Sequence, residues 1–412
     1  MTRARRLSAW IDAHQGVLYP ALDVLGFGTL TLYFLLAGNW LSATDFGLLN
    51  SLTALLTLLA AVGAAAQFIA ARKLAKDPDA ALGDLWVLDL LGTTVLLLPI
   101  LLPLPPEWRL DAVQHVGTLG YALLAVVSAH IGLLRGVLQG EERFLALWAS
   151  QFVGHAARIG VLVVVALDRV DLVTAWWSVI GAEVAHILAL LFFCVRSGTP
   201  LWPRIRPLRP TREAVTGLLL VCGAQLAMAG LLSIDLIMAG ENLGAQSGAF
   251  ATANRFGRIM CFVSASIAVV LLPRFARGRA NRAVVLGLTG LAAVLSLPIS
   301  VGSSMVLMPL MPLLFPPEVV PSVTVMTWEV GARVGLAVIQ VLVTWHVAQA
   351  RRWYPLVVAL SGAVFVGVLH LGPPTAVYYA QASAGVFWMA AVALSVIDVP
   401  SVANLRETVE PS

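Results

Sequence analysis

The sequence predicts an all-α membrane protein with about 12 transmembrane helices, arranged as two six-helix lobes around a central cavity. Two properties of the composition predict this class. Of the 412 residues, 59% are apolar and 12% are charged, whereas a soluble domain carries about 25% charged residues. The apolar residues also occur in long blocks of about 20, the length that an α-helix needs to cross a bilayer. This composition argues against a water-soluble enzyme.

Twelve apolar blocks give the predicted spans. The first six are residues 17–40, 47–71, 84–105, 117–138, 144–168 and 173–195. The second six are residues 214–240, 248–273, 283–308, 322–348, 355–372 and 377–398. Residues 196–213, with four prolines and five arginines, separate the two sets in the manner of a linker. We therefore predict an N-terminal lobe (1–195), a cytoplasmic linker (196–213), a C-terminal lobe (214–398) and a cytoplasmic tail (399–412).

Basic residues set the orientation of these spans. With a cytoplasmic N-terminus, most of the 26 Lys and Arg residues fall in the predicted inner segments, and the outer loops hold only Arg109 and Arg169. Such asymmetry orients membrane proteins with their positive loops inside, so both termini are predicted to be cytoplasmic. Because the surplus of positive charge lies in short loops, nucleic acid is not a predicted partner.

Four arginines, Arg158, Arg255, Arg258 and Arg333, lie at membrane depth inside predicted spans, whereas Arg135, at the inner end of the span 117–138, is assigned to a cytoplasmic segment. An arginine that faces lipid at the centre of a span costs about 2.5–3.5 kcal/mol, so we expect all four to face a polar cavity. From the helix rise, three of them lie roughly 15 Å from the outer ends of their spans, near the middle of the bilayer. Guanidinium groups suit phosphate oxygens, and the four are predicted to bind a pyrophosphate or sugar headgroup.

Two carboxylates offer a structural alternative for these arginines. Glu329 lies four residues before Arg333, and Asp235 reaches about the depth of Arg255. An i,i+4 pair of opposite charge is a common helix contact. Asp235 and Glu329 are therefore candidates for structural ion pairs that would neutralise Arg255 and Arg333.

Three further carboxylates, Asp23, Asp89 and Glu183, lie in the first six spans. Intramembrane carboxylates mark ion pathways, and these three are candidates to bind a coupling ion, H⁺ or Na⁺. Asp23 and Asp89 lie near the inner mouth, where hydration is the alternative. By this count of charges the first half is the more acidic and the second the more basic. No metal site is predicted, because no two span histidines have His-x3-His spacing. No cofactor other than a coupling ion is predicted.

Several segments resemble one family of transporters. They are Leu41–Leu52 (LSATDFGLLNSL), Gln67–Ala75 (QFIAARKLA), Arg135–Phe144 (RGVLQGEERF), Gly248–Arg255 (GAFATANR) and Phe315–Glu318 (FPPE). In these segments the chain resembles the polysaccharide flippase branch of the multidrug, oligosaccharidyl-lipid and polysaccharide exporter superfamily. The Gly-x-Leu-Gln-Gly stretch before Arg-Phe carries most of the likeness.

The resemblance implies a fold and a substrate. Two lobes would alternate access across a bacterial inner membrane and move an undecaprenyl-pyrophosphate-linked oligosaccharide from the cytoplasmic to the periplasmic leaflet, for surface polysaccharide synthesis. The implied partners are this lipid-linked oligosaccharide, membrane lipids and other polysaccharide assembly proteins. The protein is not expected to be an enzyme, and its sequence has no Gly-x4-Gly-Lys loop for ATP.

Two alternatives remain open. A cation-coupled multidrug exporter of the same superfamily would use Asp23 as its coupling acid, although the arginines at membrane depth disfavour a cationic drug. A membrane-embedded glycosyltransferase or polymerase would also act on lipid-linked sugars. Such enzymes usually need a large outer loop, and the predicted outer loops here are short.

Overall fold

The computed structural model describes residues 3–101, 118–166, 170–196, 212–244, 246–277, 287, 301–302, 304–348 and 353–396. Within these residues the chain is helical and has no strand. The all-α class predicted from the sequence is confirmed. The predicted ninth span (283–308) and the predicted linker lie mostly outside the described residues, and the predicted tail lies wholly outside them.

The described part of the first half folds into α1 (Arg3–Trp40), α2 (Ala43–Leu59), α3 (Ala61–Lys76), α4 (Gly83–Leu101), α6 (Thr118–Gly140), α7 (Phe144–Ala166) and α8 (Leu172–Arg196). Most predicted spans agree with these helices to within a few residues. Helix α1 begins at Arg3, well before the predicted first span (17–40). The second span, predicted as one helix, is α2 and α3 with a bend of 44° at Ala60.

The described part of the second half contains α10 (Arg212–Asn242), α11 (Gln246–Ala276), α13 (Met311–Leu314), the 3₁₀ turn η2 (Pro317–Val319), α14 (Val323–Ala348), α15 (Tyr354–Leu371) and α16 (Ala376–Val396). Six of the described helices, α7, α8, α10, α14, α15 and α16, are long and apolar enough to cross a membrane, and the bent α2–α3 pair brings the number to seven. The chain is therefore suited to a multi-pass arrangement.

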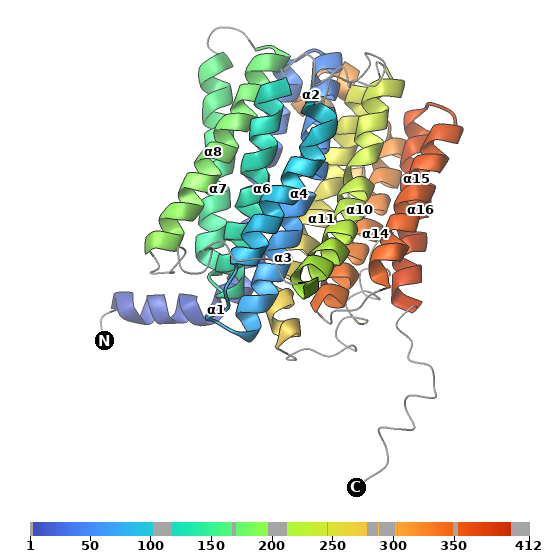
Figure 1. The fold of residues 1–412 in the computed structure, drawn as a ribbon. Coiled ribbons are helices and arrows are strands. Elements are labelled where there is room, and N and C mark those ends of the chain that lie inside the picture. The colour runs from blue at the N-terminus through green and yellow to red at the C-terminus, as the bar shows by residue number, and fades with distance from the viewer. Residues whose placement is uncertain are drawn as a thin grey trace.

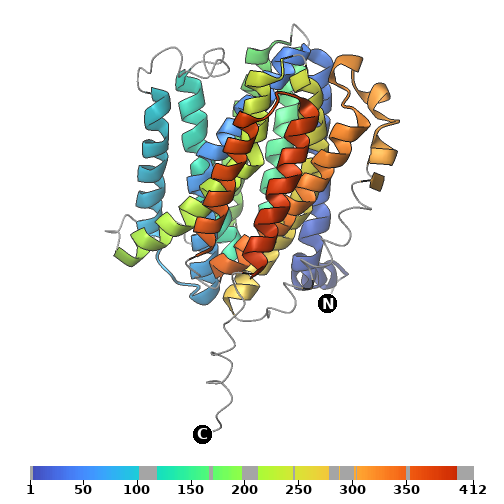
Figure 2. The ribbon, with the colours of Figure 1, turned by 90° about the vertical axis from the view of Figure 1, so that its right-hand side faces the viewer.

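Each half of the chain packs mainly on itself. In the first half α3 packs on α6, α7 on α8 and α1 on α7; in the second, α11 packs on α14, α14 on α16 and α10 on α15. Figure 1 shows α7 and α8 at one side of the bundle and α15 and α16 at the other, and Figure 2 shows α15 and α16 side by side. The halves meet where α10 lies along α2 and α3, and α11 along α1.

Helix α1 begins and α16 ends at the same end of the bundle (Figure 1), which fits the even number of spans predicted from the sequence. The first turns of α1 run across this end before the helix enters the bundle. We refer to this end of the bundle as the terminal end and to the opposite end as the far end.

A stripe of glycines on α6 brings α3 unusually close. A Cβ added at Gly132 would lie 2.1 Å from the carbonyl oxygen of Gly63, and one at Gly136 would lie 2.6 Å from that of Gln67. Gly140 continues the four-residue spacing against α3. Small residues at this spacing let membrane helices pack backbone to backbone. The stripe therefore fixes the positions of the polar side chains that α3 and α6 carry between the glycines.

Candidate substrate cavity

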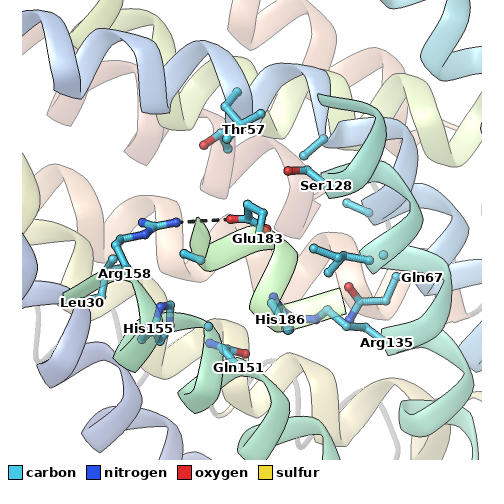
Figure 3. A pocket seen from close by; sticks show the side chains of 17 residues that line it. Leu30, Thr57, Gln67, Ser128, Arg135, Gln151, His155, Arg158, Glu183 and His186 are labelled. Atoms are coloured by element: carbon cyan, nitrogen blue, oxygen red, sulfur yellow. Dashed lines mark hydrogen bonds and ion pairs between the residues drawn. The ribbon is translucent and has the colours of Figure 1, made fainter. Parts of the chain in front are cut away.

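A cavity of about 370 Å³, lined in part by polar side chains, lies within the first half of the chain. Its walls come from α1, α2, α3, α6, α7 and α8. The polar side chains that line it are Thr57, Gln67, Ser128, Arg135, Gln151, His155, Arg158, Glu183 and His186. Figure 3 shows these side chains converging on one space from the surrounding helices. We call this space the N-lobe cavity.

Helical spacing places these groups on the cavity. Gln151, His155 and Arg158 follow one another on α7 at intervals of four and three residues, which puts them on one face. Glu183 and His186 stand three residues apart on α8. The two helices approach closely at Gly154, where an added Cβ would lie 3.0 Å from the Cβ of His186. The α7–α8 contact therefore holds both polar faces at the same wall.

Arg158 forms an ion pair with Glu183 at the cavity. A terminal nitrogen of the guanidinium donates to one carboxylate oxygen at 3.2 Å, and the two side chains are 10% and 18% exposed. The guanidinium also lies 5.5 Å from the ring centre of Tyr33, a cation–π distance. Tyr33 is itself held by hydrogen bonds to α8, donating to the carbonyl of Ala175 and accepting from Ser178.

The cavity carries net positive charge in its described lining. Arg135 and Arg158 contribute two positive charges, Glu183 contributes one negative charge, and neutral histidines contribute none. The charge count from the sequence made the first half as a whole the more acidic, but that balance does not hold at the cavity. The reason is geometric: Asp23 and Asp89 do not line the cavity.

Asp23 and Asp89 are buried rather than hydrated. They are 3% and 0% exposed, on α1 and α4. Both carboxylate oxygens of Asp89 lack a hydrogen-bond partner among the described residues. The expected alternative of hydration at an inner mouth does not fit this burial. Of the three carboxylates named for a coupling ion, only Glu183 lines the N-lobe cavity.

A second cavity of about 250 Å³ lies between the two halves. It shares Thr57, Gln67 and Arg135 with the N-lobe cavity and adds Gln225 from α10 and Gln340 from α14. We call it the inter-lobe cavity. The two cavities therefore share a wall, and Thr57, Gln67 and Arg135 lie where the N-lobe cavity approaches the second half of the chain.

Arg333 lies in a sealed network inside the second half. Its guanidinium pairs with Asp235 of α10 and, at 3.1 Å, with Glu329 of its own helix, and all three side chains are fully buried. Asn254 donates to Asp235 at 3.1 Å and accepts from Nε of Arg258 at 2.8 Å. Two arginines here balance two carboxylates. We call these five residues the C-lobe cluster; none of them lines either cavity.

The four arginines predicted to bind substrate therefore lie in different environments. Arg158 is the one that lines a described cavity. Arg333 has the i,i+4 contact with Glu329 that the sequence suggested, but Asp235 pairs with Arg333 and not with Arg255. Arg258 reaches the backbone carbonyl of Leu232, a residue in the wall of the inter-lobe cavity.

Arg255 joins the two halves of the chain. From α11 its Nε donates to Asn50 Oδ1 and a terminal nitrogen donates to Thr53 Oγ1 of α2, each at 2.5 Å. Its guanidinium stacks 3.8 Å from the ring centre of Phe34 on α1. Nearby, Ser51 of α2 donates to the carbonyl of Leu236 on α10 at 3.1 Å. We call this set of contacts the far joint.

A matching set joins the halves at the terminal end. Arg277, after the end of α11, pairs with Glu142 of the α6–α7 turn and donates to the carbonyl of Ala75 at 2.9 Å. Gln139 of α6 donates to the carbonyl of Val269 on α11 at 2.8 Å. Arg255 and Arg277 are 22 residues apart, about 33 Å along a helix. We call the second set the terminal joint; the inter-lobe cavity lies between the two halves that these joints hold together.

Glu142 has an unusual backbone. Its φ of 57° makes it the one non-glycine residue with positive φ among the described residues. It follows the end of α6, where glycine is the residue that normally takes this conformation. The turn belongs to the Gly-x-Leu-Gln-Gly segment, whose glycines pack on α3 and whose Gln139 and Glu142 both reach α11.

Sequence reasoning missed several cavity residues. Arg135 was assigned to a cytoplasmic segment, and the span histidines were not assigned to a site. A signal was present, because Gln151, His155 and Arg158 recur on one helical face of an otherwise apolar span. Several polar residues on one face of an apolar span indicate a cavity-lining face more strongly than a single polar residue does.

Comparison with known proteins identifies the fold. No protein-family model and no curated protein matches the chain. Among solved structures, the chain is similar to an outward-facing multidrug resistance MATE family transporter of the MOP superfamily, with a TM-score of 0.68 and 16% identity over 96% of this chain and 97% of that one. It is also similar to a mutant of the Vibrio cholerae MATE transporter VcmN, with a TM-score of 0.65 and 14% identity over 97% and 98% of the chains.

A third similar structure is a MATE protein in complex with MaL6, with a TM-score of 0.63 and 16% identity over 96% and 97% of the chains. Identities this low establish the fold alone. They do not distinguish the polysaccharide flippase branch from the other transporters that share this fold. The chain has the fold of the MATE transporters of the MOP superfamily.

Proposed function

We propose that this protein is a membrane transporter that carries a substrate with an anionic group across the bilayer by alternating access. The observation that carries the proposal is the N-lobe cavity, whose described lining has two arginines and one carboxylate. Guanidinium groups in a low-dielectric cavity attract phosphate and carboxylate groups and repel cations. The MATE-like fold supports transport over a glycosyltransferase or polymerase.

The two joints support alternating access. In this mechanism two lobes rock around a fixed site and open it to one side at a time. The far joint and the terminal joint each tie the first half to the second. Opening to one side would break one set of contacts while the other set persists. Apart from the Arg255–Phe34 ring contact, both sets are made of polar contacts that water can replace.

A lipid-linked oligosaccharide is the substrate class that fits both the charge of the N-lobe cavity and the family that the sequence resembles. Its pyrophosphate would bind at Arg135 and Arg158, and its prenyl tail would stay in the bilayer. On this proposal the protein works in a bacterial inner membrane with both termini in the cytoplasm. Other polysaccharide assembly proteins would be its partners, and H⁺ or Na⁺ would bind at Asp89 or Glu183 as a coupling ion.

Export of amphiphilic drugs is the second candidate. It is favoured by the fold comparison, since a similar solved structure is a multidrug resistance transporter. The comparison supports this reading better than it supports oligosaccharide flipping. A cationic drug would meet one carboxylate, Glu183, in the described lining of the N-lobe cavity, and Asp23 would be the coupling acid. The charge of the cavity is what places this candidate second.

Transport into proteoliposomes separates the two. The protein would be assayed with a labelled prenyl-pyrophosphate oligosaccharide and with a cationic dye. We expect transport of the anionic lipid, and a loss of at least about 10-fold in Arg158→Gln or Arg135→Gln because each removes a charge from the cavity. Arg196→Gln, at the exposed end of α8, is the control and should transport normally. Transport of the dye alone would reject the anionic substrate.

A further inference from the structure

Glu183 sits beside the arginine that the proposed function assigns to the anionic group. The contact is a single hydrogen bond between one guanidinium nitrogen and one carboxylate oxygen. A guanidinium can hold a carboxylate through two parallel hydrogen bonds, and Nε of Arg158 has no partner among the described residues. Glu183 therefore leaves part of the binding capacity of Arg158 unused.

We propose that the carboxylate of Glu183 occupies the place of the substrate's anionic group on Arg158, and that the substrate displaces it on binding. Glu183 then sets the affinity and selectivity of the N-lobe cavity for anions. This inference rests on the proposed anionic substrate. An ion pair of this kind keeps the arginine neutralised in the empty transporter, and it yields to an anion that offers more charge or more oxygen atoms.

Three other groups in the cavity fit a ligand with several oxygens. They are Ser128 Oγ on α6, Gln151 Oε1 on α7 and His186 Nε2 on α8, each on a side chain more than nine-tenths buried and each without a hydrogen-bond partner among the described residues. Buried polar groups are normally hydrogen-bonded. The hydroxyl and the imidazole can donate to an oxygen ligand, and the amide of Gln151 can donate after its two ends are exchanged. All three line the cavity that holds the Arg158–Glu183 pair.

The C-lobe cluster offers a comparison, because its ion pairs are fully buried. Arg333 contacts two carboxylates, is fully buried and lies beside no described cavity. Arg158 contacts one carboxylate, and both partners keep some exposure to the cavity. When displaced, Glu183 can stay solvated at the cavity wall, whereas Asp235 or Glu329 would be left as a bare charge in the core.

Calorimetric titration of the full-length protein in lipid nanodiscs tests the inference. The probes are farnesyl pyrophosphate, inorganic pyrophosphate and uncharged farnesol. Glu183→Gln keeps the shape and removes the charge, so we expect farnesyl pyrophosphate to bind about 10-fold tighter, equivalent to about 1.4 kcal/mol. Glu183→Asp keeps the charge on a shorter side chain and should give a smaller gain. Adding Arg158→Gln to Glu183→Gln should abolish the gain.

The matched control is Glu141→Gln, which removes a carboxylate paired with Arg143 outside the cavity and should leave affinity unchanged. Thermal unfolding verifies that each variant is folded, and Glu183→Asp serves as the test variant if Glu183→Gln is not. Binding of inorganic pyrophosphate as tight as that of farnesyl pyrophosphate would identify a free anion as ligand; binding of the lipid alone would identify a headgroup. Either result supports displacement if the probe that binds does so more tightly to Glu183→Gln than to the wild type.

Two results would overturn the inference, and they can be told apart. If Glu183→Gln binds no tighter than the wild type while Arg158→Gln loses binding, Glu183 does not compete with the ligand, and the anionic cavity stands. If neither the wild type nor Glu183→Gln binds either pyrophosphate probe, the anionic substrate is rejected together with the displacement.

Discussion

The N-lobe cavity and the C-lobe cluster both hold arginines and carboxylates at membrane depth, but in different surroundings. In the N-lobe cavity Arg158 has one carboxylate contact and lines a space of about 370 Å³. In the C-lobe cluster Arg333 has two carboxylate contacts and is fully buried. The cost of placing a charge in a membrane is met by neighbouring charges in the C-lobe cluster. In the N-lobe cavity one carboxylate meets part of it, and on the proposed function the substrate meets the rest. A charged residue in a span is thus no evidence of a substrate site until its partners are known.

The largest effect is expected in the C-lobe cluster. Arg333→Leu would leave Asp235 and Glu329 buried together without a positive partner, and breaking a buried ion pair costs about 3–5 kcal/mol. Arg158→Leu would leave Glu183 at a cavity wall that water reaches, so its cost should be smaller. Thermal unfolding in detergent gives both values. Equal losses in the two variants would show that the two clusters are equally buried.

The next effect concerns the wall of the N-lobe cavity. Gly132→Val would push a side chain into the backbone of α3, since a Cβ there lies 2.1 Å from the Gly63 carbonyl oxygen. Overpacking of this kind costs about 1–3 kcal/mol, and α3 and α6 must move apart at this wall of the cavity. The control is Gly160→Val on α7, where an added Cβ meets no atom within 4 Å. Unfolding temperatures should fall for Gly132→Val and change little for Gly160→Val.

The smallest effect on stability is expected at the terminal joint. Glu142 and Arg277 are partly exposed, 33% and 25%, and such pairs contribute about 0–1 kcal/mol. Their role in transport should be larger. Glu142→Arg or Arg277→Glu alone places like charges together and should slow transport, while the double exchange restores the pair. A double variant as slow as either single variant would show that this contact does not hold the halves together.

Most of the fold could be predicted from the sequence, because each segment that crosses a bilayer is a run of about 20 mainly apolar residues. The span predicted at 144–168 is α7, Phe144–Ala166, and that at 173–195 is α8, Leu172–Arg196. The bend between α2 and α3 was missed because the residues around Ala60 are leucine, alanine and valine, all compatible with an uninterrupted helix. No Pro marks the break, although Pro is a common cause of one.

The candidate site was predicted less well, because the partners of a charge depend on how helices are rotated against each other. Depth along the helix placed Asp235 level with Arg255, yet Asp235 faces Arg333, and Arg255 faces Asn50 and Thr53 across the lobes. Hydropathy gives depth and not rotation. Arg135 was missed for a related reason: it lies near the end of its span, where loop and cavity residues have the same sequence signal.

Accessibility to a water-soluble maleimide tests most directly whether one half is wet and the other sealed. Cys194, Cys222 and Cys261 would be replaced by Ala, and single cysteines introduced as Ser128→Cys in the N-lobe cavity or Ala332→Cys beside Arg333. The account predicts rapid labelling at position 128, protection there by farnesyl pyrophosphate, and no labelling at position 332 in the folded protein. Labelling at 332 with position 128 inert would contradict it.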